Sequence, residues 1–209
     1  KNDAMKPRHW DRLMEVTGVR FEINPKTFTL ANLFSMQLHR FGEAIGEIVN
    51  EALQEQKIEK QLQSIEEHWR QTALSMAKYK KNGEDRGWVL RSADDIKLEL
   101  EDHMLNLQTM GASRFVGQFA ADVRGWEKKL NLVNECLDVW FVVQRKWMYL
   151  ESIFVGAEDI RLQLPEEAKK FDAIDKAFKV VMTATQKNPN VVDACTFENR
   201  IETLENLSE

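Results

Sequence analysis

The stretch that decides the fold runs from residue 119 to residue 147 and reads FAADVRGWEKKLNLVNECLDVWFVVQRKW. Apolar residues recur along it at alternating spacings of four and three without a slip, which is typical of a helix with a coiled-coil-like seam. Only one member of the seam, Gln144, is polar. The seam consists of Phe119, Val123, Trp126, Leu130, Val133, Leu137, Trp140, Gln144 and Trp147. We therefore predict a long central helix, a structural strut on which other helices pack.

The strut is expected to be longer than a compact fold of this chain would allow. Leu150 and Phe154 continue its apolar face, so one helix over 119–154 would be about 54 Å long at ~1.5 Å per residue. A compact sphere of 209 residues would be only about 43 Å across. The predicted fold is mainly α, an elongated, rod-like multi-helix bundle. A second apolar strip, which predicts that more than one helix packs on the strut, includes Leu132, Val139, Val142 and Val143.

Helix start and stop signals divide the rest of the chain. Pro7 and Pro165 suit first helical turns, Ser92 suits an N-cap with Asp95 three residues on, and Gly111 marks a break. Residues 21–29 should be extended or looped. The expected helices cover 7–18, 30–40, 43–69, 92–111, 165–187 and 191–204. One domain with two subdomains, 1–110 and 111–209, is the predicted organisation.

The segment near residues 72–91 changes to a two-residue period, with apolar runs on both sides of Asn82-Gly83. Asn-Gly between such runs is a hairpin signal, although the spacing here favours a loop longer than two residues. We predict one projecting β-hairpin on a helical body. An isolated hairpin is marginal in water, so it should lean on the body or on a partner surface.

Two acids, Glu55 and Glu59, interrupt the apolar stripe of the predicted helix 43–69. The simpler interpretation places them at its edge, paired with Lys57, Lys60 or cations of a neighbouring helix. A functional interpretation makes them part of a joint between elements, and the sequence alone does not support it further.

Charge and composition exclude several classes of protein. The net charge of -5 and the absence of a dense basic block argue against nucleic acid as a partner. No apolar run approaches the ~20 residues that a membrane span needs, and the first residues lack a signal-peptide core. Cys136 and Cys195 stand among apolar neighbours, as reduced buried thiols do. We expect a soluble intracellular protein, and its helical final residues suggest a piece cut from a longer chain.

No pattern in the sequence indicates catalysis, a cofactor site or a metal site. A phosphate loop such as GxxxxGK[ST] is absent, and no acid pair lies in an identifiable apolar pocket. The histidines have no paired spacing, so each is interpreted as a surface or half-buried polar residue. They are His9, His39, His68 and His103. The six tryptophans are assigned to core packing rather than to nucleic-acid stacking, because Trp126, Trp140 and Trp147 share one helical face.

Several motifs resemble the linker region of dynein heavy chains. The stretch from Gln144 to Phe154, QRKWMYLESIF, carries the likeness most clearly, and the similarity runs in order from about residue 5 to 187. The other motifs are Pro7-Arg8-His9-Trp10, Ile58-Glu59 to Trp69, Ser92 to Ile96, Leu100-Glu101-Asp102-His103, Leu107 to Phe115, Asp159-Ile160 and Leu164-Pro165. Among dyneins, the motifs over 100–115 are more similar to the axonemal class than to the cytoplasmic one.

The resemblance implies a mechanical role. A dynein linker arches over a ring of six AAA+ modules, and ATP binding and hydrolysis in the ring bend and straighten it to drive ciliary and flagellar motility. The chain would be the N-terminal portion of that linker, while the distal linker and the ring, with its ATP and magnesium, lie outside it. Implied partners are the ring of the same heavy chain and, for the parent, microtubules and the intermediate and light chains. The implied location is the axoneme.

A lever needs stiff segments, a compliant place and contacts that bias two packings. Gly111 and Gly156 are the candidate compliance points, and the candidate ring contacts lie on the hairpin. These contacts are Lys80, Lys81, Asn82, Gly83 and Trp88. The alternative from another class is a helical-bundle scaffold or adaptor of the spectrin-repeat type, which binds protein partners without producing force. The sequence shows no repeat near 106 residues, and the predicted hairpin has no place in such an array.

Overall fold

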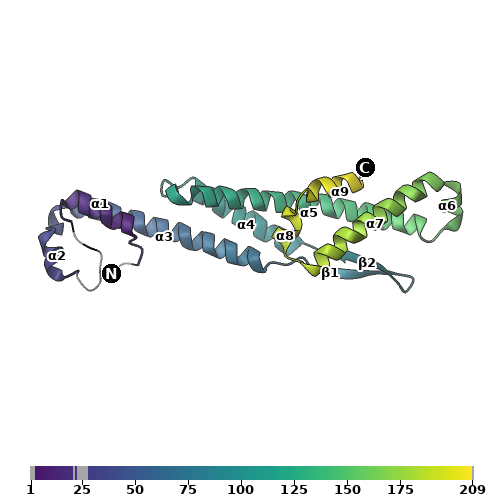
Figure 1. The fold of residues 1–209 in the computed structure, drawn as a ribbon, viewed down its shortest axis with the longest axis horizontal. Helices are drawn as coiled ribbons and strands as arrows, with labels where there is room; N and C mark the ends of the chain where they lie inside the picture. The colour runs from purple at the N-terminus through teal and green to yellow at the C-terminus, as the bar shows by residue number, and fades with distance from the viewer. Residues whose placement is uncertain (1–2, 21, 23–27, 209) are drawn as a thin grey trace. The chain divides into compact units, whose positions relative to one another are not determined.

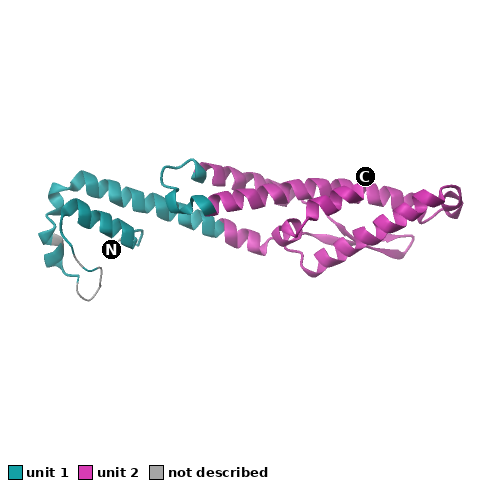
Figure 2. Ribbon diagram, turned by 45° about the horizontal axis from the view of Figure 1, so that its top comes forward, with its two compact units in different colours: residues 1–64, 110–121 teal, residues 65–109, 122–209 magenta. Residues whose placement is uncertain are grey.

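The computed structural model describes residues 3–20, 22 and 28–208. It confirms a mainly α fold with one two-stranded antiparallel hairpin (Figure 1). The chain forms two compact units, shown in Figure 2: unit 1 holds 1–64 and 110–121, and unit 2 holds 65–109 and 122–209. Both units are discontinuous in sequence, whereas the subdomains predicted from the sequence, 1–110 and 111–209, are each continuous. The reason is that helix α3 (Gly42–Gln71) contributes to both units and the chain returns to unit 1 at Met110.

Unit 1 pairs helix α1 (Pro7–Thr17) with the first part of α3. Acids spaced four apart on α3 meet cations on α1 and at its N-cap: Glu51 meets Arg12, Glu55 meets Arg8, and Glu59 lies 3.1 Å from the N-cap residue Lys6. Helical residues four apart share one face, so these contacts form a ladder. The two acids that interrupt the apolar stripe therefore pair with a neighbouring helix. The expected loop over 21–29 falls mostly outside the described residues.

The rest of unit 1 consists of short helices. The predicted helix over 30–40 is wrong in its continuity, since it splits into α2 (Leu30–Ser35) and the 3-10 helix η1 (Leu38–Arg40). Gln37 between them has φ +47°, a left-handed conformation that an α-helix cannot contain. A second 3-10 helix, η2 (Gly117–Phe119), precedes the strut. Buried apolar residues of this unit include Leu13, Met36, Ile48, Ala52, Ile58 and Leu62.

Unit 2 is built around α5 (Ala120–Phe154), the predicted strut, which is a single helix of 35 residues. Its seam residues from Val123 to Trp147 are buried, apart from Trp126, which is half-buried. Phe119 precedes the helix in η2. Around α5 lie α4 (Asp94–Gly111), the hairpin, α6 (Glu158–Gln163), α7 (Pro165–Lys187), α8 (Val191–Thr196) and α9 (Arg200–Ser208).

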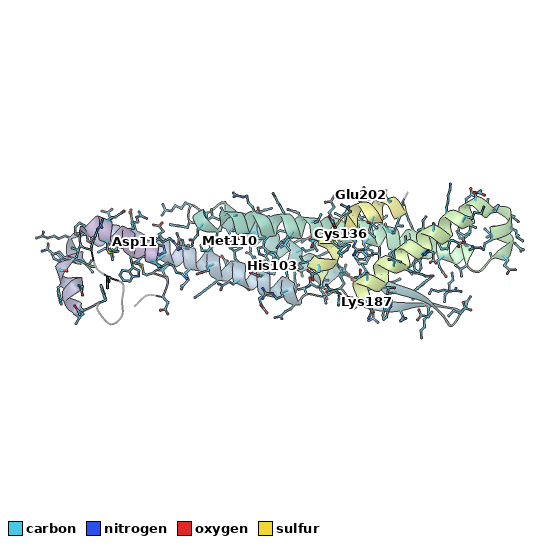
Figure 3. All side chains as sticks on the ribbon, viewed as in Figure 1. Asp11, His103, Met110, Cys136, Lys187 and Glu202 are labelled. Atoms are coloured by element: carbon cyan, nitrogen blue, oxygen red, sulfur yellow. The ribbon has the colours of Figure 1, made fainter. Side chains whose placement is uncertain are left out.

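The last part of the chain packs on α5, whereas Leu132 and Val142 of the predicted second apolar strip are 36% and 39% exposed. Cys136 of α5, labelled in Figure 3, and Cys195 of α8 are both buried. Arg200 of α9 stacks over the ring of Trp140. One continuous helix over 191–204 was expected, and the structure corrects this, because α8 ends at Thr196 and α9 begins at Arg200. Asn199 has φ +56°, and the Arg200 guanidinium donates to the Ala194 carbonyl at 2.9 Å, near the end of α8. This arrangement reverses the chain onto α5.

The hairpin joins β1 (Met76–Lys81) to β2 (Glu84–Leu90) through Asn82-Gly83 alone. Their φ values of +52° and +82° place both residues in the left-handed region that two-residue hairpin turns require. The expected longer loop is therefore wrong. The spacing of the apolar residues around Asn82-Gly83 had favoured a longer loop because the hairpin contains a β-bulge after Tyr79. Arg86 is the extra residue of β2 at this bulge. Gly87 beside it has φ +120°, which favours glycine.

Candidate functional site

The hairpin lies against α5 and α7 and contacts them through a small group of side chains, which we call the hairpin joint. Figure 1 shows β1, β2 and α7 running along the same part of α5. The joint consists of Tyr79, Lys81, Arg86 and Leu90 of the hairpin, Gln144, Trp147 and Glu151 of α5, and Asp175, Phe178 and Lys179 of α7. Gln144, Trp147 and Glu151 recur at spacings of three and four, so they face the same side of α5.

The base of the hairpin is fixed by Gln144, the one polar member of the seam. Its Oε1 accepts from the Leu90 N–H at 2.7 Å, and its Nε2 donates to the Leu90 carbonyl at 2.9 Å. Both partners are buried. The side-chain amide thus takes the place of a neighbouring strand for this residue of β2, and no buried backbone group of Leu90 lacks a partner.

An aromatic group forms the centre of the joint. The Trp147 ring stacks on Phe178 of α7 at 4.7 Å between centroids, and Tyr79 of β1 packs edge-on against it at 5.4 Å. The indole N–H donates to Asp175 at 3.0 Å, and Asp175 also accepts from Lys179 at 2.8 Å. One side chain of the strut therefore contacts both the hairpin and α7.

The tip half of the hairpin is held by a buried carboxylate. Glu151 is only 1% exposed, and three hairpin groups surround it: the Tyr79 hydroxyl at 3.4 Å, Lys81 Nζ at 3.4 Å and Arg86 Nε at 3.5 Å. These distances are longer than the ~2.7–3.2 Å of a well-formed N–H···O hydrogen bond. Two cations thus compensate the buried charge mainly by electrostatic attraction. No local pattern predicted this contact, because Lys81 lies 70 residues away from Glu151.

Burial raises the pKa of the Tyr79 hydroxyl, and the charge of Glu151 and its hydrogen bond raise it further. The folded protein therefore favours neutral tyrosine. The stability that this raised pKa contributes is fully present below pH 10.0, the ordinary pKa of tyrosine. It is lost as the pH rises through the higher pKa of Tyr79 in the folded protein.

We predict that a tyrosinate absorbance titration shows the Tyr79 transition above the ordinary range of tyrosine. Glu151→Gln should move the Tyr79 transition back toward its ordinary range, because two of the causes come from that carboxylate. Tyr79→Phe identifies the transition by removing it. An unchanged titration in Glu151→Gln would show that the carboxylate does not act on Tyr79.

The candidate ring contacts on the hairpin differ in their surroundings. Lys80, Asn82 and Gly83 are exposed at the tip. Lys81 is turned toward Glu151, and the half-buried Trp88 is covered by the ammonium of Lys78 at 4.6 Å from the ring centroid. Within the part of the chain that the structure describes, Lys80 has no ion pair. Of the five candidate ring contacts, Lys80, Asn82 and Gly83 are therefore the exposed ones.

The two candidate compliance points are both exposed. Gly111 is the last residue of α4 and lies beside the passage from unit 2 to unit 1 at residues 109 and 110. Gly156 lies between α5 and α6, and a Cβ there would meet open space. Neither has a positive φ. Their backbone conformations do not require glycine, and their role as hinges stays a prediction.

Two histidines that the sequence separates come together in unit 2. The rings of His68 on α3 and His103 on α4 lie 5.0 Å apart, both pack on Trp69, and His68 Nε2 lies 2.7 Å from Glu99. Burial and the neighbouring His68 lower the pKa of His103. Spacing along the sequence could not reveal this group, because its members belong to different helices. His9 is buried rather than exposed, with Nε2 at 3.1 Å from Glu55.

The two cysteines are part of the buried interior of unit 2. Cys136 and Cys195 are free and buried, and the hydrogen bond between them, followed by burial, raises the pKa of the Cys195 thiol. Across residues 3–20, 22 and 28–208, no group of three His, Cys, Asp or Glu side chains could hold a metal ion. No helix among these residues is long and apolar enough to cross a membrane.

Comparison with known proteins assigns the chain to a family. Residues 1–209 match the model of the dynein heavy chain, N-terminal region 2. The Dynein-1-alpha heavy chain of the flagellar inner arm I1 complex from Chlamydomonas reinhardtii is 54% identical over 209 residues, covering 100% of this chain and 4% of that protein. Dynein axonemal heavy chain 10 from Homo sapiens is 49% identical over 209 residues, covering 100% of this chain and 5% of that protein. Dynein axonemal heavy chain 17 from Mus musculus is 38% identical over 208 residues, 99% of this chain and 4% of that protein.

The chain belongs to the dynein heavy chain family and is the N-terminal region of an axonemal dynein. The resemblance described from the sequence motifs, including its axonemal character, is thereby confirmed. Flagellar, ciliary and axonemal dyneins among the relatives support the predicted location in the axoneme. The chain spans only about one twentieth of the length of these relatives.

Proposed function

We propose that this chain is a non-catalytic lever of a microtubule motor, which bends and straightens over the AAA+ ring of the same heavy chain. The observation that carries the proposal is the strut. Helix α5 runs 35 residues without a break, about 52 Å at ~1.5 Å per residue. Because its seam is buried along unit 2, the helix is stiffened by packing and can transmit force.

The chemistry of hydrolysis is assigned to the ring, with its ATP and magnesium. The sequence has no phosphate loop, and in the hairpin joint Gln144 bonds to Leu90 while Lys81 pairs with Glu151. Microtubules and the intermediate and light chains are partners of the parent protein in this proposal. An ATPase assay on the isolated chain tests the division of labour, and saturable turnover would overturn it.

The hairpin tip is the proposed contact with the ring. Lys80, Asn82 and Gly83 are exposed there, while the joint holds the rest of the hairpin on α5 and α7. A ring contact at this tip would act directly on the strut. Compliance is assigned to Gly111 and Gly156, which lie at helix ends where a change in φ and ψ breaks few hydrogen bonds.

The test uses the full motor with Lys80→Glu and, separately, with residues 80–85 replaced by Asn-Gly. Microtubule gliding velocity and ATPase rate should become uncoupled, with velocity reduced more than turnover. Lys176→Glu is the matched control, because that lysine is also exposed, lacks an ion pair among the described residues and lies in unit 2. Unchanged velocity and coupling in both hairpin variants would contradict the ring contact.

A further inference from the structure

A residue of the turn between α7 and α8 closes the C-terminal end of α3. An α-helix leaves its last carbonyl groups without donors from the helix itself. In α3, the side-chain amide of Asn190 supplies donors, because its Nδ2 donates to the Trp69 carbonyl at 2.9 Å and to the Arg70 carbonyl at 3.0 Å. The Thr72 carbonyl, just beyond the helix, lies 3.3 Å from the same nitrogen. The hydrogens of one amide group thus serve three acceptors, and α3 is capped by a residue 120 positions after Arg70.

Backbone hydrogen bonds reinforce this contact on both sides of Asn190. The Leu74 N–H donates to the Pro189 carbonyl at 2.7 Å, and the Val191 N–H donates to the Thr72 carbonyl at 3.0 Å. Leu74 and Val191 are both buried, so water cannot readily replace either bond. We call the Asn190 side chain together with these two backbone bonds the α3 clamp.

The α3 clamp lies where the end of α3, the start of the hairpin and the α7–α8 turn meet (Figure 1). Only residues 72–75 separate α3 from β1, which begins at Met76. On the other side, the clamp follows α7, the helix that carries Asp175 and Phe178 of the hairpin joint. The hairpin is therefore connected to α7 twice, through the joint along its length and through the clamp at its root.

We propose that Asn190 is a positioning residue of the lever, which passes a displacement of the hairpin and α7 on to α3. This inference rests on the proposed function, since the clamp transmits a displacement only if the chain bends and straightens. With the clamp closed, the end of α3 moves together with the α7–α8 turn. With the clamp open, residues 72–75 become a free tether that can extend to about 13–14 Å and absorb the displacement. The last turn of α3 would also fray, because its carbonyls lose their donors.

The test changes Asn190 in the full motor in two ways that preserve α8. Its Oδ1 accepts from the Asp193 backbone N–H at 3.0 Å, so Asn190 is also the N-cap of α8. Serine and aspartate cap a helix N-terminus as well as asparagine does. Serine lacks the amide that reaches α3, and an ionised aspartate has no donor. Asn190→Ser and Asn190→Asp therefore remove the bonds to α3 and keep the cap of α8.

Asn188→Ser is the matched control, because it changes the same residue type in the same turn. The Asn188 side-chain amide donates to the Asp193 carboxylate at 3.1 Å, and its oxygen accepts from the Asn190 N–H at 3.4 Å. A serine hydroxyl can keep this turn bond to the backbone two residues on. The control thus disturbs the turn without removing a donor to α3.

Two measurements on the same motors separate a positioning role from a purely structural one. Hydrogen exchange read by mass spectrometry should show the Leu74 and Val191 amides of both Asn190 variants exchanging about tenfold faster, equivalent to about 1.4 kcal/mol. Microtubule gliding velocity should fall in these variants while the ATPase rate stays unchanged, so that the ratio of velocity to ATPase rate decreases. A residue that only stabilised the fold would leave this ratio unchanged. Asn188→Ser should change neither the exchange nor the ratio.

Each contrary result overturns a stated part of the inference. Unchanged exchange in the Asn190 variants overturns the clamp, and faster exchange with an unchanged ratio overturns its positioning role. An equal loss of the ratio in Asn188→Ser overturns the assignment to Asn190. Lys80→Glu, which leaves the clamp intact, separates this inference from the proposed function. A lower ratio in Lys80→Glu but not in Asn190→Ser rejects the clamp alone, whereas an unchanged ratio in both also contradicts the ring contact.

Discussion

Replacing Trp147 with alanine is expected to lower the free energy of unfolding by about 3–5 kcal/mol. The side chain is 1% exposed, stacks on Phe178 and packs against Tyr79, so its removal opens a cavity that three elements line. The Asp175 carboxylate also loses its indole donor. Denaturant unfolding followed by circular dichroism measures the effect.

Two further variants assign the Trp147 effect to its contacts. Trp147→Phe keeps an aromatic ring but removes the donor to Asp175, and should cost about 1–2 kcal/mol. Trp126→Ala changes the same residue type on the same seam, where the ring is only half-buried and carries Lys129 over its face. It should cost markedly less than Trp147→Ala. Equal losses in the two alanine variants would contradict a special role for the joint.

Replacing Glu151 with glutamine is expected to lower the free energy of unfolding by about 2 kcal/mol, below the ~3–5 kcal/mol of a fully buried pair. The expected loss is smaller than that of a fully buried pair because Lys81 and Arg86 have 33% and 25% of their side chains exposed and can turn toward water. The loss should concentrate in the hairpin. Hydrogen exchange of the amides over 76–90 should accelerate more than that of the amides of α5. Mass spectrometry measures both rates.

A compensated variant tests whether charge or shape matters at Glu151. Combining Glu151→Met with Lys81→Met and Arg86→Met removes the acid and both cations together. Because no uncompensated buried charge remains, stability should return to the original value or exceed it. If the triple variant is as unstable as Glu151→Gln, the carboxylate acts through its packing rather than through its charge.

Local periodicity accounts for the successful part of the sequence analysis. The seam from Val123 to Trp147 is set by residues three and four apart, which become neighbours as soon as a helix forms. The single α5 and the Asn82-Gly83 hairpin follow from such short-range patterns. The errors at Gln37 and Asn199 are also local, since both residues adopt a left-handed conformation that apolar spacing does not encode.

By itself, the sequence determined a mainly helical protein with a long strut, one hairpin and membership of the dynein heavy chains. Only the tertiary structure decided what the polar residues of the strut do. Gln144 appeared as one exception in an apolar seam, and its partner Leu90 is 54 residues away. Glu151 had no signal at all, because its neighbours on the hairpin, Tyr79, Lys81 and Arg86, are 72, 70 and 65 residues distant. Spacing fixes which face a residue occupies, but a buried polar group is identified only by the distant chain that folds over it.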